Sequence, residues 1–256
     1  MAGATGALGR ALVARLTAER HDVRAEPRVD DLRGLVRGCD AVVDLTTSVD
    51  ADARRRLLAA AIAGRVRRYV QQSYVTVYRD GGDCWLDEDA PLDESAQRSV
   101  ACRSLIETEA MIRLIDPQAL PWTILRGGSF VGAGTSQDAL IARLRSRGAV
   151  VSGDGSNYLS PLNVADMASA VAAALRSAPP GSTFNVVDEP LRYGDYVDAL
   201  ADLIGVTRPA RAATSPLPES RRCSSSAART VLGWMPRHPI WPARRAASEL
   251  VSSSSG

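Results

Sequence analysis

The sequence predicts an α/β protein in which helices cover both faces of a doubly wound parallel sheet. Two observations carry this prediction: strand-like and helix-like segments alternate up to about Val187, and a glycine-rich turn precedes the first helix-like segment. The expected strands cover residues 22–25, 41–45, 68–72, 122–126 and 183–187. The expected helices cover residues 8–18, 51–63, 103–114 and 164–177.

After Val187 the pattern changes, which predicts a second, smaller unit. We expect residues 1–187 to form the core, with an insertion over about 127–162, and residues 188–251 to form a small C-terminal lobe on the substrate side. The lobe begins with a predicted helix over 193–204, continues through a Pro/Ser/Arg-rich connection and reaches a Leu-Gly-Trp segment at Trp234. The Ser-rich residues 252–256 are expected to be disordered.

Composition points to a small-molecule partner. The chain has 256 residues, 45% of them hydrophobic, so it can bury one substantial core. The net charge is +2 and the arginines are interspersed with acids, which argues against nucleic-acid binding. No apolar stretch approaches the roughly 20 residues that span a bilayer, and no signal-peptide pattern is found. We therefore expect a cytoplasmic monomer or homodimer without a membrane partner.

The reactive residue types are few. The four cysteines have no CxxC spacing, and His21 and His238 are the only histidines, so no metal site is expected. The chain contains no lysine; all of its basic residues apart from histidine are arginines. No lysine can therefore act as a base or form a Schiff base in this protein.

The glycine-rich turn is the first candidate binding site. Its glycines follow a GxxGxxG spacing, which permits a tight turn and lets the N-terminus of the following helix approach a pyrophosphate. The alternative is an ordinary Gly/Ala-rich loop. The residues expected to contact a dinucleotide are Gly3, Thr5, Gly6, Ala7, Leu8 and Gly9.

The strand before this turn is expected to be truncated. Only Met1 and Ala2 precede the turn, whereas a central strand has about five residues. We favour a start that is set too late or trimmed, because loss of a central strand exposes the edges of its neighbours. A genuine truncation would argue against cofactor binding.

Several further segments, in order along the chain, resemble one enzyme family. They cover residues 3–9, 38–45, 67–73, 87–91, 125–128, 153–155, 163–168 and 232–234. Together they resemble the NAD-dependent epimerase/dehydratase group of extended short-chain dehydrogenases/reductases over nearly the whole chain. The resemblance implies a Rossmann-type fold and an NAD or NADP cofactor.

The catalytic Tyr-x-x-x-Lys pair of that family is missing. With Glu109 as the anchor, Ala101 stands at the Tyr position and Leu105 at the Lys position, and we expect both to face the pocket. Counting back from Tyr78, the family's Ser/Thr position falls on Tyr74, preceded by Ser73. The resemblance makes Tyr74, assisted by Ser73, the candidate catalytic residue and proton donor. The alternative is that Tyr74 only fills the pocket, and Tyr78 is predicted to be structural.

The resemblance also assigns the two ends of the cofactor. Gly127 and Gly128 fall at the nicotinamide end, unless they form a simple turn. Arg28 falls where a basic residue favours a 2′-phosphate, so NADP is preferred over NAD, unless Arg28 is a solvated surface residue. Asp31 and Leu32 resemble the Asp-Leu pair that holds adenine, although the segment before them is short.

Three functions remain open at this stage. The first is an atypical NAD(P)-dependent enzyme performing redox or redox-assisted isomerisation on a small organic molecule, such as a secondary metabolite. The second is a non-redox cyclase, dehydratase or epimerase on the same fold. The third is an inactive NAD(P)-binding regulator. The lost Tyr and Lys favour the second and third over an ordinary reductase, whereas the substrate-side segments 153–155 and 232–234 favour an enzyme.

Overall fold

The computed structural model describes residues 1–25, 32–46, 50–95, 98–212, 218–238 and 240. Its helices are α1 (Ala7–Ala18), α2 (Leu32–Val36), α3 (Ala51–Ala63), α4 (Val100–Arg113), α5 (Ser136–Arg145), α6 (Val164–Ser177), α7 (Tyr193–Leu203) and α8 (Ser226–Leu232), with a 3-10 turn at Val75–Val77. Its strands are β1 (Ala41–Asp44), β2 (Arg68–Tyr74), β3 (Trp85–Leu86), β4 (Trp122–Gly127), β5 (Ser129–Val131), β6 (Val150–Ser152), β7 (Tyr158–Leu159), β8 (Pro161–Asn163), β9 (Ser182–Val186), β10 (Leu191–Arg192), β11 (Ala210–Ala212) and β12 (Arg222–Cys223).

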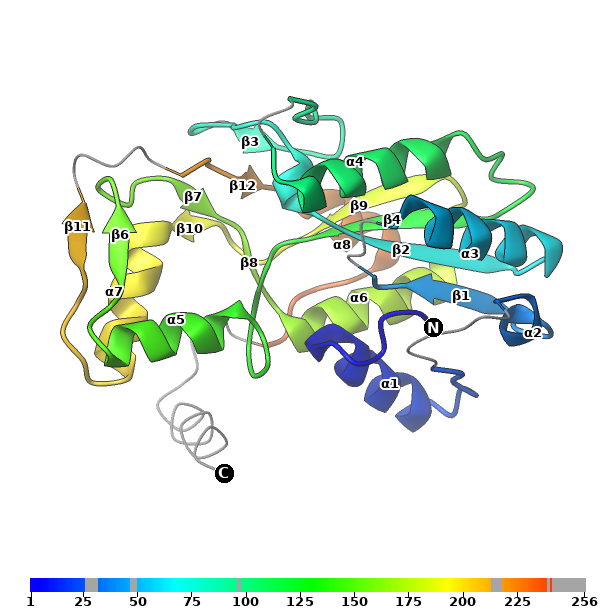
Figure 1. Ribbon diagram of the computed structural model, residues 1–256, viewed down its shortest axis with the longest axis horizontal. Coiled ribbons are helices and arrows are strands. Elements are labelled where there is room, and N and C mark those ends of the chain that lie inside the picture. Colours follow the sequence, from blue (N-terminus) through cyan, green and yellow to red (C-terminus); the bar gives the residue numbers. More distant parts are fainter. Residues whose placement is uncertain (26–31, 47–49, 96–97, 213–217, 239, 241–256) are drawn as a thin grey trace.

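The centre of the molecule is a parallel sheet in the order β1-β2-β4-β9 (Figure 1). Helices α1 and α6 lie on one face and α3 and α4 on the other, so the predicted doubly wound α/β class is confirmed. Strand residues alternate between the two faces. In β2, Val70 joins the core beneath α1 and α6, whereas Tyr69 joins the core beneath α3 and α4.

Side-chain caps explain where several helices begin. Asp50 accepts hydrogen bonds from two N–H groups of the first turn of α3 (3.0 and 2.9 Å). Asn163 caps α6 and Ser99 caps α4 in the same way. The predicted bounds of α3 and α6 match the structure, while α4 starts earlier than predicted because its cap lies before Val100.

The edge of the sheet next to β1 departs from prediction. Ala2 pairs with β1, donating its N–H to the Val43 carbonyl (2.9 Å). The strand predicted over residues 22–25 is wrong: the structure has no strand there, and the Met1 amino group donates to the Arg24 carbonyl (2.6 Å). A strand needs a ladder of backbone hydrogen bonds to a partner, and residues 22–25 form no such ladder in the described part of the chain.

The segments predicted as insertion and lobe gather away from the sheet. Helices α5 and α7 and the paired strands β6 and β11 lie together at one end of the molecule (Figure 1). They share a separate apolar cluster that includes Leu144, Val151, Tyr196 and Leu200. The segment around Trp234 instead packs on α6, where Trp234 Nε1 donates to the Asp166 carbonyl (3.1 Å). The division into core and lobe at Val187 stays a prediction.

Candidate active site

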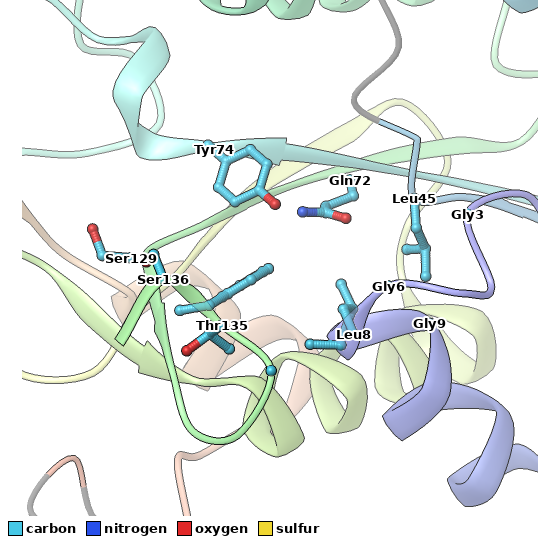
Figure 2. A pocket seen from close by; sticks show the side chains of 13 residues that line it. Gly3, Gly6, Leu8, Gly9, Leu45, Gln72, Tyr74, Ser129, Thr135 and Ser136 are labelled. Carbon is cyan, nitrogen blue, oxygen red and sulfur yellow. The ribbon is translucent and has the colours of Figure 1, made fainter. Parts of the chain in front are cut away.

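A cavity of about 460 Å³ opens where the glycine turn meets the carboxyl ends of β1 and β2 (Figure 2). A loop after β5 and the start of α5 form its other wall. The lining residues are Gly3, Gly6, Ala7, Leu8, Gly9, Leu45, Gln72, Tyr74, Ser129, Phe130, Gly134, Thr135 and Ser136. The structure thus brings the predicted glycine turn and the predicted Tyr74 to one cavity; Thr5 belongs to the same turn but is not among these lining residues.

The glycines of the turn are required by close backbone approaches. Gly3 has φ +78°, and a Cβ atom there would lie 2.9 Å from the Leu45 carbonyl carbon. A Cβ atom on Gly9 would lie 2.3 Å from the Gly3 carbonyl oxygen. Gly6 differs, since a Cβ atom there would meet nothing nearer than 3.9 Å. The turn is therefore tightly folded, with Gly6 open toward the cavity.

This turn fits a dinucleotide phosphate. No side chain caps α1 at Gly6, and Ala7, Leu8 and Gly9 of its first turn line the cavity. The first N–H groups of a helix lack intrahelical acceptors and carry the positive end of the helix dipole. Arg10 adds a guanidinium beside the turn, where its Nη1 donates to the Thr5 carbonyl (2.5 Å). An anion placed here would find both hydrogen-bond donors and positive charge.

Gln72 and Tyr74 enter the cavity from the end of β2. They are two residues apart and share the face of the sheet to which Val70 belongs. The Tyr74 ring lies 5.3 Å from the Phe130 ring at an interplanar angle of 53°. Burial raises the pKa of Tyr74 above its ordinary value, and the neighbouring Gln72 amide opposes that rise. Tyr74 is therefore protonated at neutral pH.

Ser73 points away from this cavity. It belongs to the other face of β2, is almost completely buried, and its Oγ has no hydrogen-bond partner among the described residues. Its predicted assistance to Tyr74 stays a prediction. Tyr78 is also buried, donating to Asn185 Oδ1 (2.7 Å) and accepting from Arg126 Nη1 (2.7 Å). These contacts agree with a structural role.

The positions of the family's Tyr and Lys do not line the cavity. Ala101 is exposed on α4. Leu105 is buried against Val77 and Cys102, in a cluster that Tyr74 contacts from the cavity side. Neither residue is among the cavity-lining residues, so the expectation that both face the pocket is not met: Ala101 faces solvent and Leu105 packs into an apolar cluster.

The two glycines after β4 are constrained by the fold itself. The Gly128 N–H donates to the Val186 carbonyl (3.0 Å), and a Cβ atom on Gly128 would lie 2.2 Å from the Ser160 carbonyl oxygen. A Cβ atom on Gly127 would press on Phe130 at 3.0 Å. Neither glycine is among the cavity-lining residues, so their contact with nicotinamide stays a prediction.

The adenosine end is only partly described. Arg28 and Asp31 lie outside the described residues. Leu32 begins α2 and packs against the core beneath α3 and α4. The preference for NADP therefore stays a prediction.

Sequence reasoning missed part of the lining. Phe130, Ser129, Thr135 and Ser136 come from a connection whose path is set by pairing of β5 with β8. Gln72 could have been found, because strand alternation places it on the same face as Tyr74. No group of three or more side chains able to hold a metal ion occurs in the part of the chain that the structure describes. Within the same residues, no helix is both long and apolar enough to cross a membrane.

Comparison with known proteins decides the family. A family described as NAD(P)H-binding matches residues 25–178, more than half of the chain. The chain belongs to this NAD(P)H-binding family. The matched segment holds the sheet from β1 to β4, whereas the glycine turn and α1 precede it.

One curated relative is a 3-diazoavenalumate denitrifying reductase from a Streptomyces species. It is 29% identical to this NAD(P)H-binding protein in an alignment covering 94% of this chain and 96% of the relative.

Solved structures share the fold. A dTDP-glucose 4,6-dehydratase from Bacillus anthracis in complex with NAD has a TM-score of 0.83 at 15% identity, covering 99% of this chain and 96% of that one. RMD from Pseudomonas aeruginosa complexed with NADPH has a TM-score of 0.76 at 19% identity, covering 98% and 97%. The predicted epimerase/dehydratase resemblance and the predicted NAD or NADP cofactor are confirmed, and the relatives support an NAD(P)-dependent enzyme.

Proposed function

We propose that the protein is an NAD(P)H-dependent reductase that supplies one proton, from Tyr74, and no general base. One observation carries this proposal. The described residues that line the cavity include no carboxylate, imidazole or guanidinium, and Tyr74 is the only titratable group among them. Because burial keeps the pKa of Tyr74 high, its phenol can donate a proton near neutral pH but cannot accept one.

This arrangement favours reduction over oxidation. Oxidation of an alcohol needs a base that accepts the hydroxyl proton as hydride leaves. Reduction needs hydride, which bound NAD(P)H supplies from its nicotinamide, and at most one proton for the acceptor. The chain's own residues would hold the phosphates at the glycine turn and orient a flat acceptor against the aromatic surface that Tyr74 and Phe130 form.

For the acceptor we propose a diazo compound. A neutral diazo carbon that gains one proton and one hydride becomes a C–H₂ group, and its nitrogen leaves as dinitrogen. An arenediazonium ion gains only the hydride and loses dinitrogen, so it needs no proton at all. Neither reaction asks the protein for a base. The reductase relative, named for denitrification of a diazo compound, supports this choice.

The test starts with calorimetric titration of the full chain with NADH and NADPH. Anaerobic incubation follows with NAD(P)H and either an α-diazo ester or an arenediazonium salt. We expect loss of the reduced-nicotinamide absorbance, release of dinitrogen, and deuterium from labelled cofactor on the carbon that carried nitrogen. A protein-free control corrects for spontaneous reduction. Absence of nucleotide binding would favour the non-redox enzyme, and binding without turnover would favour the regulator; either result refutes the proposal.

A further inference from the structure

The lining of the cavity contains a buried amide that the proposed function has not used, the side chain of Gln72. Gln72 is only 3% exposed, yet its Nε2 makes no hydrogen bond of ordinary distance and angle with any described residue. Its neighbour Gln71 behaves differently, because Gln71 Nε2 donates to the Gln72 carbonyl (2.9 Å). A buried donor without an acceptor is unfavourable and calls for a functional explanation.

The direction of this amide supplies the explanation. Figure 2 shows the Gln72 amide nitrogen turned toward the Tyr74 hydroxyl oxygen, with both side chains projecting from β2 into the cavity. A protonated phenol is a weak acceptor, whereas a phenolate is a strong one. An amide N–H in this position therefore gains most when Tyr74 has given its proton away.

We propose that Gln72 is a positioning residue for Tyr74, whose amide N–H stabilises the phenolate left after proton donation. This inference rests on the proposed role of Tyr74 as the proton donor. In the step itself, the O–H bond of Tyr74 breaks, the proton joins the acceptor, and the oxygen keeps the electron pair and accepts the Gln72 N–H. The phenolate then recovers a proton from water.

A neutral amide suits a donor better than an ammonium does. A fixed positive charge would lower the pKa of the phenol and leave a smaller fraction of it protonated before substrate arrives. The amide dipole also favours the phenolate, but less strongly than a full charge. It lowers the pKa of Tyr74 by less than burial raises it, so the pKa stays above its ordinary value. Tyr74 thus stays protonated at rest and gives its proton up more easily than an isolated buried phenol.

The first experiment tests the interaction between Gln72 and Tyr74 without depending on catalysis. A fluorinated tyrosine placed at position 74 is titrated by fluorine NMR in the nucleotide-free protein, with Gln72 intact or replaced in Gln72→Met. We expect a higher apparent pKa of this phenol in Gln72→Met, and no change in the exposed control Gln118→Met. Gln72→Glu, which keeps the size and replaces the donor by a carboxylate, should raise that pKa further. An unchanged pKa in both Gln72 variants overturns the inference.

The kinetic arm uses the two diazo probes. Gln72→Met should slow reduction of the neutral α-diazo ester about tenfold, as expected for one lost hydrogen bond to a charged group. It should leave reduction of the arenediazonium salt within about twofold, since that reaction takes no proton. Equal slowing of both probes would show that Gln72 only shapes the cavity. If the unaltered protein reduces neither probe, the proposed function fails. The fluorine titration still tests whether the Gln72 amide interacts with the Tyr74 hydroxyl.

Discussion

The ion pair between Arg126 and Glu109 offers the most quantitative test of the fold around the site. Both side chains are about 1% exposed. Arg126 Nη2 donates to Glu109 Oε2 (2.6 Å), and Arg126 Nε donates to Glu109 Oε1 (3.1 Å). The pair joins the end of β4 to α4. Glu109→Gln keeps the shape and one acceptor oxygen but leaves the guanidinium charge without its counter-charge.

Loss of one partner from a buried pair costs about 3–5 kcal/mol of unfolding free energy. For a chain of this size each kcal/mol lowers the melting temperature by about 2–4 °C, so a fall of roughly 10 °C is expected. Urea unfolding and thermal melts measure both quantities. Glu107→Gln, an exposed change on the same helix, is the matched control and should stay within about 0.5 kcal/mol. A loss below about 1 kcal/mol in Glu109→Gln would refute the reasoning, since Tyr78 and the Glu88 carbonyl would then suffice for Arg126.

The remaining predictions concern the cofactor and the proton. Gly6→Leu should weaken NAD(P)H binding at least about tenfold with little change in melting temperature, because the space beyond Gly6 is open to the cavity; unchanged affinity by calorimetry contradicts the phosphate site. Arg28→Ala should remove a preference for NADPH over NADH, and equal affinities in both proteins count against the assignment. Tyr74→Phe should slow reduction of the neutral diazo ester while sparing the diazonium salt, and full activity on both would limit Tyr74 to shaping the cavity. In the parent protein the Tyr74-dependent rate should be constant through neutral pH and fall only as pH rises past the raised pKa of Tyr74, because only the protonated phenol donates.

The buried parallel strands and the long helices could be predicted because their signals are local. Apolar strands can be recognised from a short stretch of sequence. So can helices with an N-terminal cap and an apolar face, such as α3 and α6. The strand expected over residues 22–25 failed for a non-local reason. Its pattern resembles a strand, but a strand needs a backbone ladder, and residues 22–25 form none: the Met1 amino group donates to the Arg24 carbonyl, and the Arg24 side chain donates to the Arg37 carbonyl.

Some residues of the candidate site could likewise be predicted from local sequence, whereas others depend on contacts between distant segments. The spacing of its glycines is enough to predict the glycine turn, and the resemblance to the family predicts Tyr74; both line the cavity. Phe130 and Ser129 could not be assigned from sequence, because they reach the cavity only through the pairing of β5 with β8. Ser73 adjoins Tyr74 in sequence, yet strand alternation turns its side chain to the other face, where its Oγ is buried.

The absence of lysine and the raised pKa of Tyr74 bear on the direction of catalysis. In a reversible ketone reduction, the group that donates the proton forward must accept it in reverse, so the same phenol has to act as acid and as base. In the proposed role, a buried Tyr74 beside a neutral amide would serve only the forward direction near neutral pH. Release of dinitrogen makes the forward direction permanent, because the gas leaves the site and no reverse step follows. A cavity whose described lining holds one titratable proton donor and no charged side chain would therefore suffice for the proposed diazo reduction, whereas it would be poorly suited to the reversible reactions that a Tyr-Lys pair supports.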